Sequence, residues 1–160
     1  REASATLPLV DIEDAWTAYR IGESYYRSQQ LPQALPYFEK AVALRQYNLD
    51  FQEKLGVTLA RLGQLNKAKE IFNFVLSEDL KRPLTYSNLG YMSASSGKFD
   101  KALYYYDKAL SFDPDHENAL LNKAALLLHL KQTLKARTIL QHLVEKHPNN
   151  QQARQALDAF

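Results

Sequence analysis

Four histidines and a pair of aspartates are the residues of this 160-residue chain whose types could do acid–base or metal chemistry. His142 and His147 are five residues apart, a spacing that does not place both on one helical face. The chain has no His-Glu-x-x-His pair, Gly-x-Ser-x-Gly elbow or phosphate-binding glycine loop. Asp113 and Asp115 flank Pro114, a pattern typical of a helix cap and turn. We therefore expect no catalytic residue, no metal site, no cofactor and no enzyme activity.

Three consecutive tyrosines, Tyr104, Tyr105 and Tyr106, could stack on nucleic-acid bases or anchor a peptide. Successive residues of a helix are rotated by about 100°, so the three rings cannot share one face. We expect Tyr106 in the core of a helical hairpin, Tyr105 where the next hairpin packs, and Tyr104 on the polar outer side.

The composition favours one helix-rich globular domain. Apolar residues make up 46% of the chain, and only five Gly and six Pro interrupt it. The net charge of +2 gives no electrostatic reason to expect nucleic acid or an anionic membrane. The absence of cysteine from the sequence excludes disulfides, thiolate metal sites and a catalytic thiol.

The most apolar stretch, ALLNKAALLLHL at 119–130, is too short and too polar to span a bilayer, so we expect no membrane insertion. The sequence begins REASATLPLV without an initiating Met. We interpret the chain as a processed or excised piece of something longer.

A period of 34 residues organises the chain. A large aliphatic residue followed by Gly recurs at this period, and the next step replaces the pair by Lys-Ala: Ile21-Gly22, Leu55-Gly56, Leu89-Gly90 and Lys123-Ala124. An alanine also recurs and is followed four residues later by a large residue: Ala34 and Phe38, Ala68 and Phe72, Ala102 and Tyr106, Ala136 and Leu140. Each unit shows two helical stripes separated by a short polar break, which predicts a helical hairpin. The small residues let the two helix axes approach closely.

The stretch LTYSNLGYMSASSGKFDKALYYYDKALSFDP at 84–114 resembles a tetratricopeptide repeat, and four units in register cover about 15–148. The resemblance implies an all-α fold, a right-handed α-solenoid of four helix-turn-helix repeats plus a C-terminal capping helix. The expected parts are an N-terminal lead (1–14), four repeats (15–48, 49–82, 83–116 and 117–148) and the capping helix (149–160).

Two of the units depart from the family pattern. The first has Ala18 where the family usually has a large aromatic residue, with Trp16 two residues earlier, and Pro36 predicts a bend or irregular turn in its second helix. When the four repeats are aligned, each set of equivalent positions forms a column. The fourth repeat has Lys123 and Thr133 in columns that are normally apolar. Such drift is typical of a solenoid end.

The resemblance implies that partners bind a concave groove lined by the first helix of each hairpin. The residues expected to face this groove are Trp16, Tyr19, Glu23, Tyr26, Arg27, Glu53, Val57, Arg61, Leu84, Asn88, Tyr91, Asn122 and His129. Aromatic and aliphatic anchors beside a few polar groups suit an extended peptide or an amphipathic helix. For Tyr26 and Tyr91, packing within the protein is an equally open interpretation.

The sequence thus predicts a protein-interaction scaffold that binds a peptide or partner helix. A different hypothesis is the non-catalytic repeat region of a larger enzyme or of a secretion or assembly protein. RNA binding is less favoured because the charge is near neutral. A clamp for a chaperone-tail carboxylate is also less favoured, because its Lys and Arg columns hold residues such as Tyr19, Glu23 and Leu84. Self-association could occur through the groove or an exposed solenoid end.

Overall fold

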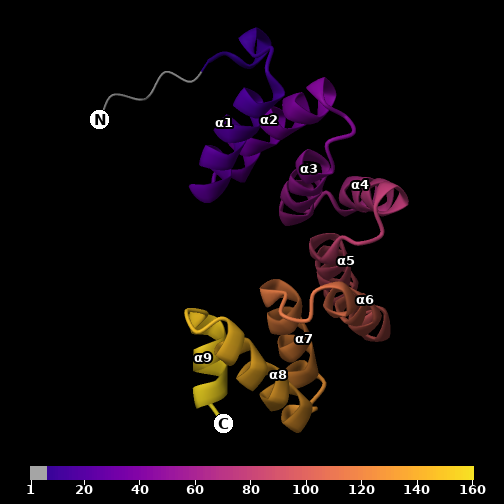
Figure 1. Cartoon of the computed structure of the whole chain (residues 1–160), viewed down its shortest axis with the longest axis vertical. Coiled ribbons are helices and arrows are strands. Elements are labelled where there is room, and N and C mark those ends of the chain that lie inside the picture. The colour runs from indigo at the N-terminus through magenta and orange to yellow at the C-terminus, as the bar shows by residue number, and fades with distance from the viewer. Residues whose placement is uncertain (1–6) are drawn as a thin grey trace. The chain divides into compact units, whose positions relative to one another are not determined.

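The structure, a computed structural model, describes residues 7–160 and contains nine α-helices, one short 3-10 helix and no strand in this range (Figure 1). The elements are η1 (Leu9–Asp11), α1 (Ala15–Arg27), α2 (Leu31–Leu44), α3 (Leu49–Arg61), α4 (Leu65–Glu78), α5 (Pro83–Ser95), α6 (Phe99–Phe112), α7 (Glu117–His129), α8 (Thr133–Lys146) and α9 (Gln151–Asp158). The all-α architecture expected from the repeat is confirmed. The described chain divides into a first compact unit that ends at Glu78 and a second, Asp79–Phe160, and each is described by itself.

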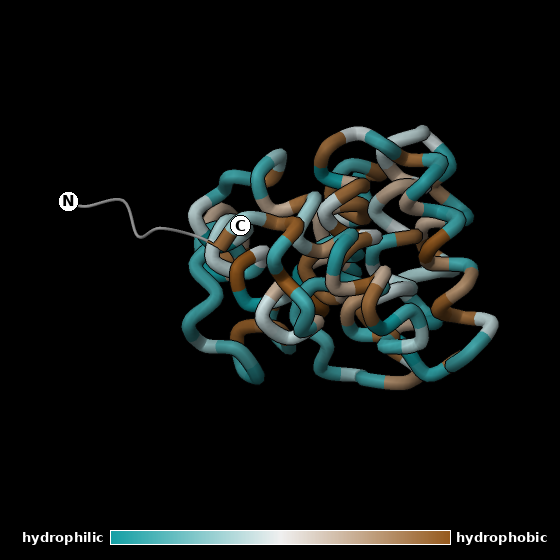
Figure 2. The backbone as a smooth tube through the Cα atoms, turned by 90° about the horizontal axis from the view of Figure 1, so that it is seen from above, coloured by the Kyte–Doolittle hydropathy of each residue, from teal (hydrophilic) through white to brown (hydrophobic). Residues whose placement is uncertain are grey.

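A close approach of two helices forms the core of each hairpin. In the first three hairpins a glycine of the first helix lies against an aromatic ring of the second, as Gly22 on Phe38, Gly56 on Phe72 and Gly90 on Tyr106. A β-carbon added to Gly90 would lie 2.5 Å from Cε1 of Tyr106, a distance that no ordinary carbon contact allows. The fourth hairpin instead has Ala124 and the smaller Leu140, and both are buried. Hydrophilic and hydrophobic stretches alternate at short intervals along the visible helical turns in Figure 2, as one-sided packing requires.

Side-chain caps begin several of the helices. Asp14 accepts a hydrogen bond from the Thr17 backbone N–H at 2.7 Å, and this bond holds the pKa of the Asp14 carboxyl below its usual range. Asn48 and Asn150 cap α3 and α9 in the same way, each accepting from the N–H three residues later. These caps satisfy amide groups that have no partner inside the helix.

The turn inside each hairpin contains one residue with a left-handed backbone. The four residues lie 34 positions apart, with φ of 60° at Gln29, 79° at Gly63, 72° at Gly97 and 59° at Lys131. Glycine adopts this conformation without steric cost, whereas Gln29 and Lys131 carry a β-carbon that disfavours it. The outer two turns are therefore more strained than the inner two.

The helix α2 runs without a break through Pro36, so the irregular turn expected there is not found. Proline at this position removes the bond that its missing N–H would give to the Pro32 carbonyl, and its ring crowds that carbonyl. The buried residues Ala34, Phe38 and Ala41 lie on both sides of the proline and pack the helix in place.

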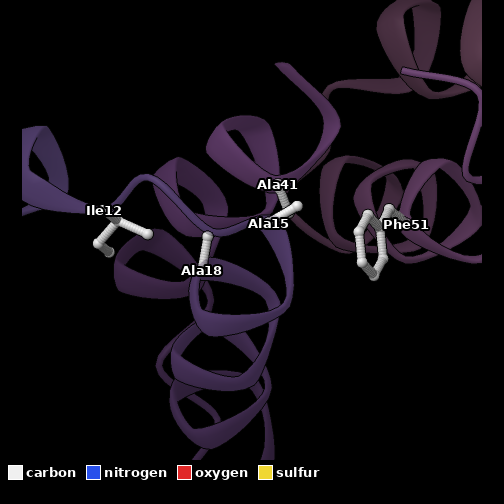
Figure 3. Packing of buried hydrophobic residues seen from close by; sticks show 5 residues of the cluster. All are labelled: Ile12, Ala15, Ala18, Ala41 and Phe51. Carbon is white, nitrogen blue, oxygen red and sulfur yellow. The ribbon is translucent and has the colours of Figure 1, made fainter. Parts of the chain in front are cut away.

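The expected N-terminal lead (1–14) is described only from residue 7, since residues 1–6 lie outside the described residues, and its described part contains the short 3-10 helix η1. Pro8 precedes η1, and Ile12 then inserts into the hairpin core, where it is buried with Ala15, Ala18, Ala41 and Phe51 (Figure 3). This apolar contact holds the segment that contains η1 against α2. The first hairpin thereby receives a cover from residues that precede it.

The C-terminal helix α9 covers the last hairpin, as expected for a capping helix. Its Ala153 is fully buried in a cluster with Leu120, Ala124, Leu140 and Leu143. Ala156 and Leu157 pack against the edge of this cluster. An apolar face of α7 and α8 that would otherwise meet water is thus closed.

The three consecutive tyrosines have three different environments, as the helical rotation predicts. Tyr106 is buried, Tyr105 is half-buried and Tyr104 is exposed. The placement of Tyr105 against the next hairpin is not what the structure shows, since its ring lies beside Tyr104 and Lys101 of the same helix. Burial raises the pKa of Tyr86 on α5, and the nearby Tyr104 and Tyr105 hydroxyls add to this shift. The side of α6 that meets the next hairpin carries Leu103 and Leu110 instead.

Candidate partner-binding surfaces

In the first unit, aromatic side chains of α1 and α3 form a continuous cluster. The Trp16 indole meets the Phe51 ring edge-on at 4.8 Å between centroids. The Tyr19 ring stacks on the Phe51 ring, also at 4.8 Å between centroids. Tyr19 also reaches Phe38 beneath it, at 5.6 Å. Trp16 remains 46% exposed. The cluster therefore offers a rigid apolar surface to a partner and still contributes to packing.

Burial raises the pKa of the Tyr19 hydroxyl to about 12, and the carboxylates of Glu23 and Asp50 add to the shift. The hydroxyl thus stays protonated at any physiological pH and can donate a hydrogen bond. It lies at the border between the aromatic cluster and the charged groups further along α1.

Tyr26 is the second-last residue of α1, and its ring lies next to two cations of α3. Lys54 Nζ is 4.5 Å from the centroid of its ring, and the Arg61 guanidinium carbon is 5.0 Å from it. Arg61 is also held by a 2.7 Å hydrogen bond to the Gln29 side chain. The ring is thus fixed between α1 and α3 by cation–π contacts. We name these residues, with Trp16 and Tyr19, the α1/α3 surface.

Glu23 occupies the middle of the α1/α3 surface. Its Oε1 is enclosed and lies 2.8 Å from Lys54 Nζ, an ion-pair contact that lacks hydrogen-bond geometry. Its Oε2 lies 3.5 Å from Arg27 Nε. Because the two cations compensate this carboxylate, it does not repel an acidic partner.

The other residues predicted for this surface lie differently. Val57 is half-buried, whereas Glu53 is buried and is not exposed for a partner to contact. Sequence reasoning missed Phe51 and Lys54. Lys54 could have been found, since it lies one period before Asn88 and two periods before Asn122, which were both selected.

In the second unit, α5 and α7 form the walls of an open pocket of about 480 Å³. Three of the predicted residues, Tyr91, Asn122 and His129, line this pocket together. Tyr91 stands at its rim with 56% of its surface exposed. We name this feature the α5/α7 pocket.

The floor of the α5/α7 pocket is apolar. Phe99 lies 5.2 Å from the His129 ring, and the Tyr106 ring, packed on Gly90, closes the base. Burial raises the pKa of the Tyr106 hydroxyl, and the neighbouring Tyr91 adds to this shift. Leu84 and Asn88 do not line the pocket, and the Asn88 amide donates to the Leu84 carbonyl at 2.8 Å within α5.

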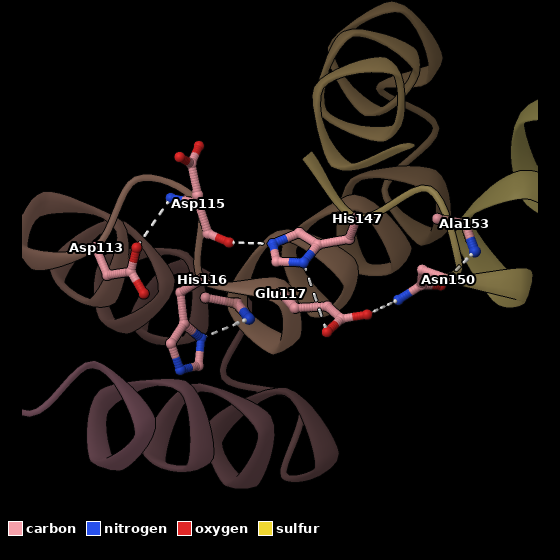
Figure 4. Close-up of polar contacts among 8 residues, drawn as sticks. Asp113, Asp115, His116, Glu117, His147, Asn150 and Ala153 are labelled. Atoms are coloured by element: carbon pink, nitrogen blue, oxygen red, sulfur yellow. Dashed lines mark hydrogen bonds and ion pairs between the residues drawn. The ribbon is translucent and has the colours of Figure 1, made fainter. Parts of the chain in front are cut away.

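Two histidines, one on α8 and one directly after its last residue, contact the turn before α7. The spacing of the histidines in the sequence did not predict this arrangement. His142 Nε2 lies 2.8 Å from Asp115 Oδ1, and Figure 4 shows His147 reaching the Asp115 carbonyl and the Glu117 carboxylate. Within residues 7–160 no three His, Cys, Asp or Glu side chains are arranged to hold a metal ion. These contacts join the third and fourth hairpins, and Asp113 accepts from the Asp115 N–H in the expected turn.

The helices come in pairs that repeat every 34 residues, and within a pair a small residue of one helix packs against a large side chain of the other. These features define a class of protein, the all-α helical-repeat solenoids. Within that class, the tetratricopeptide repeat pattern matches residues 19–73, 54–117 and 93–159. The chain belongs to the tetratricopeptide repeat family. Tetratricopeptide repeats generally mediate protein–protein interaction and are typically non-catalytic scaffolds. In the part of the chain that the structure covers, no helix is both long and apolar enough to cross a bilayer.

Similar proteins are found among sequences and among solved structures. The BBSome complex member BBS4 of Bos taurus is 30% identical over 120 residues, which is 75% of this chain and 23% of BBS4. A thermophilic tetratricopeptide repeat protein of Thermus thermophilus, TTC0263, superposes with a TM-score of 0.80 at 20% identity, covering 91% of this chain and 80% of that one. The protein YrrB, described as a tetratricopeptide repeat protein with an unusual peptide-binding site, gives a TM-score of 0.66 at 23% identity over 93% and 77% of the two chains. The chain thus spans less than a quarter of BBS4.

Proposed function

We propose that the chain is a protein-interaction module that binds an extended peptide or an amphipathic helix on the inner faces of its first helices. In the second unit the binding site is the α5/α7 pocket, and in the first unit it is the α1/α3 surface. The single observation that carries the proposal is the convergence of Tyr91, Asn122 and His129 on one apolar-floored pocket.

The chemistry of the α5/α7 pocket suits a peptide. Tyr91 supplies a large exposed ring at low entropic cost, and the floor of Phe99 and Tyr106 accepts an apolar side chain. The Asn122 amide and the His129 ring supply donors and acceptors for a peptide backbone. The similarity in fold to YrrB, whose description names a peptide-binding site, agrees with this use of the fold.

The α1/α3 surface provides a second anchor of a different kind. Trp16 offers exposed aromatic area, while Tyr26 is already engaged by Lys54 and Arg61. Because both cations contact the Tyr26 ring, we expect its removal to disturb the positions of the two cations as well as the contact with a partner.

Peptides selected from a random display library on the immobilised protein test this proposal. We expect Tyr91→Ala to weaken binding of selected peptides about tenfold, the usual effect of removing an aromatic anchor. Tyr26→Ala is the equivalent change in the first unit. Tyr104→Ala is the matched control, because Tyr104 is equally exposed but lines no part of the pocket. Peptides that bind Tyr26→Ala and Tyr91→Ala as tightly as the unaltered protein would show the proposal to be wrong.

A second candidate function is the non-catalytic repeat region of a larger enzyme or of a secretion or assembly protein. The observation that favours it is the similarity to BBS4, a complex member of which this chain spans only 23%. Mass spectrometry of the endogenous protein tests it, since a chain no longer than 160 residues would contradict it. Self-association through an inner face or a solenoid end stays a further prediction, tested by size-exclusion chromatography with light scattering.

A further inference from the structure

Lys123 occupies a column in which every other hairpin has a packed aliphatic side chain. The equivalent residues are Ile21, Leu55 and Leu89, and the last two are almost fully buried. Lys123, on α7, has only 23% of its side chain exposed. Its aliphatic stem takes the position of the leucine in the other hairpins, and its ammonium group extends beyond that position to Asp107.

Lys123 lines an open cavity of about 420 Å³. Three aliphatic side chains, Leu103 of α6, Leu127 of α7 and Ile139 of α8, line it together with Lys123. Asp107 and Lys135 stand at its polar part. The volume lies within the range of small-molecule sites, and the lining combines apolar walls with a few charged groups, as such sites do.

The charge of this cavity is positive. Lys123 Nζ makes one ion pair, at 2.6 Å to Asp107 Oδ1, and has no other hydrogen-bond acceptor within reach in the described residues. An ammonium group has three donors, so two remain for a ligand. Lys135 adds a second cation, whereas Asp107 is the one carboxylate in the lining contributed by residues 7–160.

We propose that this cavity binds an aliphatic carboxylate. The hydrocarbon part lies against Leu103, Leu127 and Ile139, and the carboxylate accepts hydrogen bonds from the ammonium groups of Lys123 and Lys135. Asp107 has 61% of its side chain exposed, so it can turn to water when the ligand carboxylate takes its place on Lys123. None of these residues lines the α5/α7 pocket, so this site is independent of the proposed peptide-binding function.

Hexanoate is the probe, added to the whole chain and followed by amide chemical shifts. We expect saturable shifts at Leu103, Lys123 and Ile139, and weaker binding at high ionic strength because the contact is ionic. Hexan-1-ol, which has the same hydrocarbon part and no charge, should bind at least about tenfold more weakly. Equal binding of the alcohol, or shifts confined to Tyr91 and His129, would overturn the proposal.

The variant Lys123→Met keeps an unbranched side chain that is one atom shorter and removes the charge. We expect hexanoate to bind this variant at least about tenfold more weakly, whereas Lys146→Met, an exposed lysine elsewhere on α8, should leave affinity unchanged. Because methionine suits an apolar column, Lys123→Met should also unfold at a higher temperature, which shows that any loss of binding is not loss of fold. Unchanged affinity in Lys123→Met would contradict the site.

Asp107→Asn provides an independent test with the opposite direction. Removing the internal carboxylate leaves Lys123 without its ion-pair partner, so hexanoate should bind several-fold more tightly. If Asp107→Asn abolishes binding, then Lys123 does not exchange its partner in this way and the proposal fails.

Discussion

At the scale of single residues, the conformation of one turn position separates the inner hairpins from the outer ones. Gly63 and Gly97 adopt a left-handed backbone freely, whereas Gln29 and Lys131 adopt it at a cost. Gln29 gains some compensation because its side chain accepts a hydrogen bond from Arg61. Lys131 is exposed and makes no such contact among the described residues, so its strain is uncompensated.

Lys131→Gly is therefore expected to stabilise the protein by about 1 kcal/mol, the difference between the cost of a left-handed lysine and the extra unfolded-state freedom of glycine. Urea unfolding followed by circular dichroism measures this. Gly97→Ala is the reciprocal change and should destabilise by a similar amount, since its φ is 72° and nothing crowds the site. A Lys131→Gly variant no more stable than the original protein would contradict the expected strain.

His116 makes the stability of the second unit depend on pH. Its Nδ1 accepts a hydrogen bond from the Ala119 N–H at the start of α7, which requires the neutral ring. Burial lowers the pKa of His116 below its ordinary value of 6.5; Asp113 and Glu117 oppose this shift, and His147 adds to it. The unfolded chain therefore takes up a proton first as the pH falls. The stabilisation is present above about pH 6.5 and is lost as the pH falls from there toward the lower folded pKa.

The variant His116→Asn isolates this contribution, because asparagine caps a helix and does not titrate. We expect its free energy of unfolding to fall less than that of the original protein between about pH 7.5 and about pH 5.5. Comparing the two proteins removes the contributions of the other titrating groups. Identical pH profiles would show that His116 is not responsible.

At the scale of helices, the size of the residue in the first helix is matched to the ring it meets in the second. Gly90→Ala would place a β-carbon 2.5 Å from Tyr106, so we expect a loss of about 1–3 kcal/mol from overpacking. The fourth hairpin shows the compensated pair, Ala124 with Leu140. Adding Tyr106→Leu should therefore restore part of the loss in a double-mutant cycle measured by thermal unfolding. Strictly additive effects would contradict this matching.

Much of the element-scale structure follows from the sequence because a period of 34 repeats four times. The alanine, glycine and aromatic columns predict which faces pack, and α9 carries its own apolar stripe. The period fails where contacts are peculiar to one place. The insertion of Ile12 and the packing of Trp16 on Phe51 involve residue types that do not recur at the 34-residue period.

The candidate binding residues, like the packing faces, could be predicted where they follow the repeat period and not where they depend on local contacts. Tyr91, Asn122 and His129 share one pocket because their columns face the same side of α5 and α7. Glu53 shares such a column and is nevertheless buried. The position in the repeat predicts which way a side chain points, but it does not predict how much of that side chain is exposed. The convergence of His142 and His147 on Asp115 could not be predicted, because 27 and 32 residues separate them from it and only the turn geometry brings them together.

At the scale of the whole molecule, the two compact units should respond separately to damage at the C-terminus. Ending the chain at Asn149 removes α9 and uncovers the cluster of Leu120, Leu140 and Leu143. We expect amide hydrogen exchange in α7 and α8 to accelerate at least about tenfold, because their protection depends on local burial. Exchange in α1 and α2 should stay unchanged. Equal acceleration throughout the chain would show instead that the molecule opens as one cooperative body.

The matched pairs of glycine and aromatic ring also bear on how such arrays can be rearranged. Gly22 with Phe38, Gly56 with Phe72 and Gly90 with Tyr106 each span both helices of one hairpin. Recombination between hairpins conserves these pairs, whereas recombination inside a hairpin with the fourth hairpin as one parent would join Ala124 to an aromatic ring or a glycine to Leu140. The hairpin, and not the single helix, is therefore the module that duplication or protein engineering can exchange without a penalty in packing.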